Sequence, residues 1–571
     1  MSHLLSFRHL SLQGYAHLGM IPYNITRPAA PDGELRSLPL GPVSTSVIDM
    51  GKLLTICDAL QFTSLSHMFR AIAGSAEEFA KVFIFKQLEP LTPAQLASFR
   101  VALADPRIIW TKRSQCLTDL VQVGVLAEFK KLSHKQDLYR FIKSGIPISL
   151  CTVFPVLKSN LTSVRGVVNP SINELIRRPF FADCGLPRLH PALASLRRFS
   201  YLKLYDGVSM FYQYPLSPDV AKLFTTVVQE SSHISMFTHT RLPMGFCYAV
   251  HLSQGGLTVV CELAWHLMGN QKVLVAYYIW VDNILLVGES KEALEMYSKY
   301  FELVAKAINM VVRAESEIDT SGVWAGLKLD LKAKDYALSE KFLTKAAELR
   351  DIVKAQTVIP LNLYQKYMGC VAYAAYVLRF PFAYLHGYLR LPVVDVMVRK
   401  VKTPMVSLEG VSHAVAEPLF NKQVKIPLVP PAIAFKEASS GEYILFTDAS
   451  TEALGAVLVK GTEVPQHISR RWSQSFLGLH INVLEAWAIF EAILHWPELR
   501  SMHLDLYCDN TAVVGALNKF YSPSMDLNAV IVEIHKLCLD RTLYLTVHYV
   551  PSALNLADKP SRPTEYPEYE C

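Results

Sequence analysis

The sequence predicts a multidomain protein of mixed α+β and α/β class. Two observations lead to this prediction. Short runs of β-branched and aromatic residues alternate with longer helical stretches, as strands and helices do in mixed folds. Acidic residues also follow strand-like segments in two separate regions, residues 206–282 and 448–558. With 571 residues, the chain is long enough for about three or four folding units that each bury a core.

The most apolar stretch of the chain, residues 273–288, contains a single acid, Asp282, which is followed by Asn283. Burying a carboxylate without a partner costs several kcal/mol, so an acid in such a place is usually paired or bound to a metal. The β-branched and aromatic flanks predict two strands with Asp282 and Asn283 at the turn between them. An Asp-Asn pair favours a turn on its own account. This stretch alone therefore leaves a metal site and a plain turn equally open.

A second acid with the same setting lies upstream. Asp206 ends a strand-like segment and precedes Gln213, and the segment RLPMGF (residues 241–246) lies between the two acids. In this order the three segments resemble motifs A, B and C of a reverse transcriptase palm. The resemblance implies a right-hand polymerase with fingers, palm and thumb, and it favours the metal-site interpretation of Asp282.

The resemblance also covers the nucleotide site. Lys158, in the segment VFPVLK, and Arg165 correspond to two cations of the family's fingers that hold an incoming triphosphate. Phe211 lies where the family has an aromatic gate that collides with a ribose 2′-hydroxyl, which implies dNTP selection; an ordinary core aromatic is the alternative. The residues implied in nucleotide binding are Lys158, Arg165, Gly207, Phe211, Met244 and Gly245.

Phosphoryl transfer from a nucleoside triphosphate uses divalent cations held by carboxylates. Asp206 and Asp282 are the expected catalytic ligands, the carbonyl of Gly207 is a further one, and the expected cofactor is Mg²⁺ or Mn²⁺, two ions per active site. Asn283 departs from the family, whose YxDD box has a second acid there. Asn keeps an acceptor oxygen without the charge. The alternative function is therefore a domesticated, polymerase-inactive relative that binds nucleic acid or scaffolds an assembly.

The C-terminal region carries a second set of acids. Asp448 and Asp509 end strand-like segments, Glu485 lies in a helical one, and Asp558 follows a turn. These residues resemble the Asp, Glu, Asp, Asp tetrad of ribonuclease H, in which paired metals position a water against a phosphodiester. All four are expected as catalytic and metal-binding residues. Glu485 alone also fits a capping box with Asn482, which is its alternative role.

Three short sequence segments narrow the resemblance to one group of retroelements. The segments HINVLE (480–485), CDNTAVV (508–514) and NLADKPSR (555–562) look like the enzymes of tyrosine-recombinase retrotransposons, the DIRS, Ngaro and VIPER kinds. Because no protease, integrase or recombinase precedes them in this sequence, a stand-alone frame of the VIPER type is expected. The implied partners are an RNA template, a DNA primer, the RNA–DNA hybrid and dNTPs; the sequence does not predict an oligomeric state.

The amino-acid composition is consistent with a nucleic-acid enzyme but does not identify one. A net charge of +6 is too small to indicate a polyanion partner. Basic pairs such as Lys130-Lys131 and Arg177-Arg178 fit either a solvated surface or phosphate contacts. The ten cysteines form no CxxC pair, so neither a zinc cluster nor a disulfide framework is indicated. No apolar run reaches the ~18 residues of a membrane helix. An intracellular protein, cytoplasmic or nuclear, is expected; the acid-free first 31 residues leave a mitochondrial location as the alternative.

Five regions are predicted along the chain. Residues 1–110 contain helical stretches such as 75–88 but no chemistry of known type. Residues 111–335 form fingers and palm, with a hairpin at 324–329, and residues 336–400 form a helical thumb with helices at 339–354 and 362–378. Residues 401–440 are rich in proline and read as a linker. Residues 441–571 form the ribonuclease H domain.

Overall fold

A computed structural model gives the structure of the chain as two compact units, Met1–Ala333 and Lys334–Cys571. Each unit is described by itself. The structure describes residues 32–44, 46–104, 108, 110–158, 160–176, 186–187, 189–378, 380–389, 391, 393–398, 401–422, 424–428, 443–519 and 521–569. The basic pair at 177–178 lies outside these residues, as do 1–31 and 429–442.

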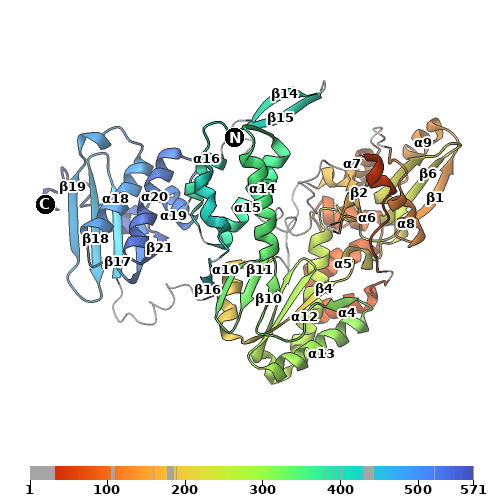
Figure 1. Cartoon of the computed structure of the whole chain (residues 1–571), viewed down its shortest axis with the longest axis horizontal. Coiled ribbons are helices and arrows are strands. Elements are labelled where there is room, and N and C mark those ends of the chain that lie inside the picture. Colours follow the sequence, from red (N-terminus) through yellow and green to blue (C-terminus); the bar gives the residue numbers. More distant parts are fainter. Residues whose placement is uncertain are drawn as a thin grey trace. The chain divides into compact units, whose positions relative to one another are not determined.

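The first unit contains two main β-sheets (Figure 1). One sheet has the strand order β1-β6-β5-β2-β3 and the other has the order β7-β8-β4-β9. Both lie in the region predicted as fingers and palm, and we call them the fingers sheet and the palm sheet after that prediction. Strands β10 and β11 form the hairpin predicted at 324–329. The strands are β1 (Leu126–Leu132), β2 (Leu150–Leu157), β3 (Val164–Pro170), β4 (Tyr201–Gly207), β5 (Thr225–Gln229), β6 (Ile234–His239), β7 (Val275–Trp280), β8 (Asn283–Gly288), β9 (Val312–Ala314), β10 (Ser321–Trp324) and β11 (Leu327–Asp330).

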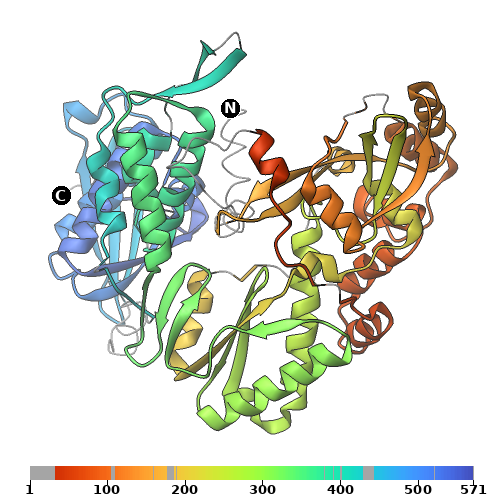
Figure 2. The ribbon, with the colours of Figure 1, turned by 45° about the vertical axis from the view of Figure 1, so that its right-hand side comes forward.

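Two long helices, α12 (Ala249–Leu267) and α13 (Lys291–Ala307), pack against each other and against the palm strands (Figures 1 and 2). Helix α13 begins after Ser290, whose Oγ accepts a hydrogen bond from the backbone N–H of Ala293. Its buried positions Leu294, Tyr297 and Phe301 recur with the period of a helix, so one face turns to the sheet. This packing fixes strands β4, β7 and β8, which carry the first pair of acids.

Helices from residues 1–110 belong to the same core. Leu53, Leu65 and Phe79 are buried in one hydrophobic cluster with the palm residues, and the Phe69 ring stacks on Tyr214 at 5.9 Å. The helix predicted at 75–88 is α6 followed by a π-helical turn, Ala80–Ile84. Among the described residues of the unit, the remaining α-helices are α3 (Asp32–Ser37), α4 (Met50–Ala59), α5 (Thr63–Ala73), α6 (Ala76–Phe79), α7 (Pro93–Leu103), α8 (Gln115–Gln122), α9 (Lys135–Ile142), α10 (Leu189–Ser195) and α11 (Pro218–Ala221).

The second unit starts with the helices predicted for a thumb, α14 (Glu340–Lys354) and α15 (Leu361–Val377). The predicted linker, 401–440, is wrong in its first part. Residues 401–407 form β15 (Val401–Ser407), the central strand of a sheet with β13 (Val358–Pro360) and β14 (Val393–Val398). Pro404 lies just beyond the residues that pair with β13, so its missing N–H breaks no bond on that side. The unit also contains α16 (His386–Leu389), β12 (Asp335–Leu338) and β16 (Ile426–Pro427).

A five-stranded mixed sheet forms the rest of this unit, in the order β19-β18-β17-β20-β21. Strands β17, β20 and β21 are parallel, and β17-β18-β19 form an antiparallel meander. Helices α18 and α20 pack together, and α18 also packs on the sheet. The elements are β17 (Tyr443–Ala449), β18 (Ala453–Lys460), β19 (Gln466–Arg471), α18 (Ile481–His495), β20 (Met502–Cys508), α19 (Thr511–Lys519), α20 (Met525–Asp540) and β21 (Leu543–Tyr549).

Among the helices of the described residues, none combines the length and the apolar character needed to cross a bilayer.

Candidate active sites

The turn between β7 and β8 presents Asp282. Trp280 pairs with Asn283, so the two turn residues are Val281 and Asp282, one position before the pair predicted from the sequence. Val281 has a φ of 62°, which a β-branched residue rarely adopts. Such a conformation persists only where the surroundings hold it.

The side chain of Gln254 on α12 stabilises this conformation of Val281. Its Oε1 accepts a hydrogen bond from the backbone N–H of Val281 at 2.9 Å, and its Nε2 donates to the carbonyl of Ile279 at 2.8 Å. Gln254 is 2% exposed, so both bonds form away from water. The two bonds bracket the strained turn and thereby fix the direction in which Asp282 projects.

Asp206 lies at the end of β4, in register with Asn283 of β8. Burial raises the pKa of Asp206 to about 7, and the negative charge of Asp282 adds to this effect. Burial also raises the pKa of Asp282 to about 6. Oxygen ligands of this kind suit a hard divalent cation, because a cation between them removes the repulsion that disfavours their charged forms. The residues present therefore fit the metal that the sequence implied.

Arg313 is a cation of this site that the sequence analysis missed. It lies on β9 in register with Asp206, and its guanidinium is 3.2 Å from Oδ2 of that acid. Its charge lowers the pKa of Asp206, as does the charge of Arg165. The two partners are 107 residues apart in sequence, so no local pattern connects them.

A pocket of about 410 Å³ surrounds the two acids. It is lined by the two acids and by five of the six residues implied in nucleotide binding: Lys158, Arg165, Gly207, Phe211 and Met244. Burial, with the nearby charge of Arg165, lowers the pKa of Lys158. Phe211 is 6% exposed, belongs to the core cluster and also lines the pocket, so its location is consistent with both roles considered for it.

Gly245, the sixth residue, does not line this pocket. Its φ is 126°, and a Cβ at this position would lie 1.8 Å from the carbonyl oxygen of Val168. The glycine thus lets the 241–246 loop approach strand β3, where the N–H of Val168 donates to the carbonyl of Met244 at 2.8 Å. Asn173 secures the loop from the other side by donating to the carbonyl of Gly245 at 2.9 Å. Gly245 shapes the pocket through the backbone rather than by contact.

The N-terminal region also contributes to this pocket, which the sequence did not indicate. Residues 40–43 form part of its lining. The N–H of Gly41 donates to the carbonyl of Val164 at 3.0 Å, and the N–H of Leu40 donates to Oδ2 of Asp119 at 2.8 Å. This segment therefore runs along β3 beside Lys158.

The four C-terminal acids come together at one end of the β17–β20 sheet. Asp448 lies in β17, Asp509 follows β20, Glu485 lies on α18, and Asp558 follows β21. Burial raises the pKa of Asp448, and the charges of Asp509 and Asp558 raise it further. Burial also raises the pKa of Glu485, together with the charges of Asp448 and Asp509. This donor set fits a cation for the same reason as the first pair.

Glu485 is 4% exposed and faces this cluster, so the capping-box alternative is wrong for it. The N-cap of α18 is His480, whose Nδ1 accepts from the N–H of Asn482. The side chain of Asn482 instead accepts a hydrogen bond from Asn510 at 2.8 Å. Ligand atoms of Glu485, Asp509 and the buried Cys508 all lie within 4.8 Å of one another.

Comparison with known proteins supports the nature of this C-terminal part. Residues 438–529 match the family model described as the RNase H-like domain found in reverse transcriptase. No curated protein sequence matches the chain. The predicted fold class, a mixed α/β multidomain protein with a C-terminal ribonuclease H-like domain, is confirmed.

Solved structures of the foamy viral protease-reverse transcriptase are distantly similar. The form called dRH, in complex with double-stranded DNA, has 13% identity and a TM-score of 0.41, with 89% of this chain and 83% of that chain covered. The complex with an RNA/DNA hybrid has 14% identity and a TM-score of 0.39, covering 76% and 52%. A further complex with double-stranded DNA has 14% identity and a TM-score of 0.39, with 86% of this chain and 97% of that chain covered. Identities this low say nothing about activity.

Proposed function

We propose that this protein is an RNA-directed DNA polymerase that also carries ribonuclease H activity. The observation that carries the proposal is the presence of two separate carboxylate centres, one in each unit. The first centre faces a pocket with cationic walls, as a triphosphate site requires. The second lies in the part of the chain that matches the RNase H-like family model. The substrates are dNTPs, an RNA template with a DNA primer, and the RNA–DNA hybrid.

At the first centre, Asp206, Asp282 and the carbonyl of Gly207 would hold the cations. Two divalent cations bound there would activate the primer 3′-hydroxyl and stabilise the leaving pyrophosphate. Lys158 and Arg165 supply positive charge for the triphosphate from the fingers sheet. Phe211, at the pocket wall beside Gly207, selects against a ribose 2′-hydroxyl by occupying its space.

At the second centre, Asp448, Glu485, Asp509 and Asp558 would share two cations. Metals held in this way activate a water and stabilise the departing 3′-oxygen of the RNA strand. The polymerase centre makes the hybrid and the nuclease centre removes its RNA, so the two activities act in sequence on the same product.

We further infer that the chain comes from a tyrosine-recombinase retrotransposon of the DIRS, Ngaro or VIPER kind. The segments 480–485, 508–514 and 555–562 support this inference. These segments contain Glu485, Asp509 and Asp558, three of the acids that we propose for the nuclease centre.

Asn283 favours a second candidate function, a polymerase-inactive relative that binds nucleic acid. It lies in register with Asp206 and places an uncharged amide where the family has an acid. Extension of a labelled DNA primer on a defined RNA template, with Mg²⁺ and then Mn²⁺, separates the two candidates. We expect extension with at least one metal. No extension with either metal, by a protein that still cleaves the hybrid, would establish the second candidate.

A further inference from the structure

The last acid of the nuclease centre lies on a segment without helix or strand. Residues 555–566, called the C-terminal loop, follow β21 and consist of turns. A strand is held by its ladder of backbone hydrogen bonds, whereas a loop depends on the side chains that anchor it. The position of Asp558 therefore depends on the side-chain contacts that anchor this loop.

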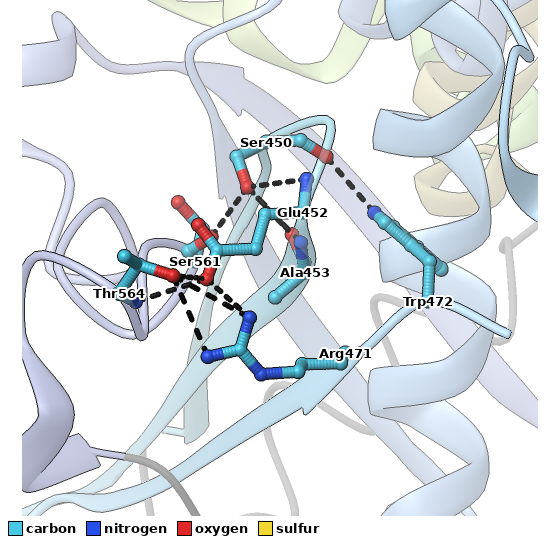
Figure 3. Close-up of polar contacts among 7 residues, drawn as sticks. All are labelled: Ser450, Glu452, Ala453, Arg471, Trp472, Ser561 and Thr564. Atoms are coloured by element: carbon cyan, nitrogen blue, oxygen red, sulfur yellow. Dashed lines mark hydrogen bonds and ion pairs between the residues drawn. The ribbon is translucent and has the colours of Figure 1, made fainter.

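Ser561 is a fully buried anchor of the C-terminal loop, with 0% exposure. Its Oγ lies 2.5 Å from Oδ2 of Asp448 and 2.8 Å from the carbonyl oxygen of Asp558. Its own carbonyl accepts a hydrogen bond from Oγ of Ser450 at 2.6 Å (Figure 3). A hydroxyl has a single proton, which an ionised Asp448 attracts more strongly than a carbonyl does. The Ser561 hydroxyl thus joins the Asp448 carboxylate to the loop segment that carries Asp558.

Two further contacts bring the C-terminal loop close to the sheet. Nδ2 of Asn555 donates to the carbonyl of Thr447 at 3.0 Å, next to Asp448. Gly455 of β18 lies beneath the loop, and a Cβ there would come within 2.4 Å of the backbone nitrogen of Ser561. Only glycine allows this approach without a shift of backbone. The loop is therefore seated directly on β17 and β18.

A polar cluster at the edge of the sheet holds the far end of the C-terminal loop (Figure 3). The N–H of Thr564 donates to Oε1 of Glu452 at 2.9 Å, and Arg471 bonds the same carboxylate oxygen at 2.6 Å. The side chains of Arg471 and Glu452 are 48% and 28% exposed. Exposed ion pairs contribute little, because water screens them. The buried contacts of Ser561 should consequently outweigh this outer cluster.

We propose that Ser561 is the positioning residue of the nuclease centre: its hydroxyl fixes the carboxylate of Asp448 relative to the loop that carries Asp558, and so sets the spacing of the metal ligands. The proposal rests on the proposed ribonuclease H function. Partners of metal ligands that orient them typically change metal affinity by roughly 10- to 100-fold when removed. A residue that only stabilised the fold would change stability without a selective effect on metal binding.

The test measures Mn²⁺ binding to the full chain by electron paramagnetic resonance. Asp206→Asn and Asp282→Asn are present in every variant, so that only the nuclease centre binds the metal. We expect Ser561→Ala to weaken Mn²⁺ binding by roughly 10- to 100-fold. Thr564→Val, at the exposed end of the loop, should weaken it by less than about threefold, since exposed pairs contribute little. Ser552→Ala is the matched control, because Ser552 is exposed and precedes the loop.

The outcomes separate the two proposals. A parent protein that binds no Mn²⁺ at this centre would contradict the proposed function. A parent that binds Mn²⁺ while Ser561→Ala binds it equally well would overturn the role of Ser561, and so would equal losses in Ser561→Ala and Thr564→Val. If Ser561→Ala does not fold, Ser450→Ala replaces it, since that change removes the bond to the Ser561 carbonyl and three contacts within the turn that follows β17. Unchanged Mn²⁺ binding in folded Ser450→Ala would likewise overturn the proposal.

Discussion

The backbone N–H of Gly207 donates to the carbonyl of Asp282 over 2.8 Å. Gly207 follows Asp206 directly, so this bond ties the end of strand β4 to the turn between β7 and β8. The two acids are therefore held close before any cation arrives. Burial raises the pKa of both acids, and the negative charge of Asp282 raises that of Asp206 further.

Without metal, this arrangement predicts a dependence of stability on pH. The folded pKa of Asp206 is about 7, above its ordinary value of 3.8, so between these values the folded state binds more protons than the unfolded state. Stability contributed by this group is therefore lost as the pH rises from about 4 to about 7. Asp206→Asn should melt at a higher temperature than the wild type at pH 8 without metal, and the difference should vanish near pH 4. A less stable variant at pH 8 would contradict the raised pKa of Asp206, which burial and the charge of Asp282 together cause.

The Gln254 side chain should be required for DNA synthesis but not for hybrid cleavage. Gln254→Leu removes both bonds to the turn and leaves buried partners unsatisfied, which costs about 1–3 kcal/mol for each buried group. We expect unfolding by urea at lower concentration and a strong loss of primer extension. Gln254→Glu keeps the acceptor for Val281 but loses the donor to Ile279, so it should also fail. Thr258→Val, which removes a bond to the Gln254 carbonyl within the helix, is the control. Normal DNA synthesis by Gln254→Leu would show that Gln254 is not needed to position Asp282.

Asn283→Asp should leave DNA synthesis equal or raise it. The change restores the family acid next to Asp282, whose Oδ1 lies 3.5 Å from Nδ2 of Asn283. A third carboxylate strengthens cation binding and increases repulsion when no cation is present. The variant should thus lose stability without metal and need less Mg²⁺ for half-maximal rate. Complete loss of synthesis would mean that the site is built around the amide.

Phe211→Val should lower the preference for dNTPs over rNTPs. Space opened at the pocket wall admits a 2′-hydroxyl, and a change of this size in a pocket is worth roughly 10- to 100-fold in selectivity. The measurement is the ratio of kcat/KM for a matched pair of nucleotides. Loss of stability with an unchanged ratio would leave only the core role of this ring.

Site residues that a local sequence pattern marks could be predicted from the sequence. A lone acid in an apolar stretch predicted Asp282, and acids after strand-like segments predicted Asp448 and Asp509, because burial and strand ends follow from the sequence itself. Helices α14 and α15 were predicted for the same reason, since their apolar positions follow the period of a helix.

Residues placed by distant parts of the chain could not be predicted. The turn lies at Val281-Asp282 instead of Asp282-Asn283, because Gln254 holds a conformation that local preference disfavours. Arg313 and the 40–43 segment reach the first pocket through tertiary pairing alone. The prolines of residues 401–440, Pro404 among them, predicted a linker where the central strand β15 lies.

One assay with two readouts tests the central claim most directly. A DNA primer and an RNA template carry different labels, so that extension and RNA cleavage are measured in the same reaction. We predict that Asp206→Asn abolishes extension and still cleaves a preformed hybrid, whereas Asp509→Asn extends the primer and leaves the RNA intact. Asp509→Asn should also be at least as stable as the wild type without metal, because one repulsive charge near Asp448 is gone. Wild-type extension by Asp206→Asn, or hybrid cleavage by Asp509→Asn, would contradict the assignment of two metal-dependent centres.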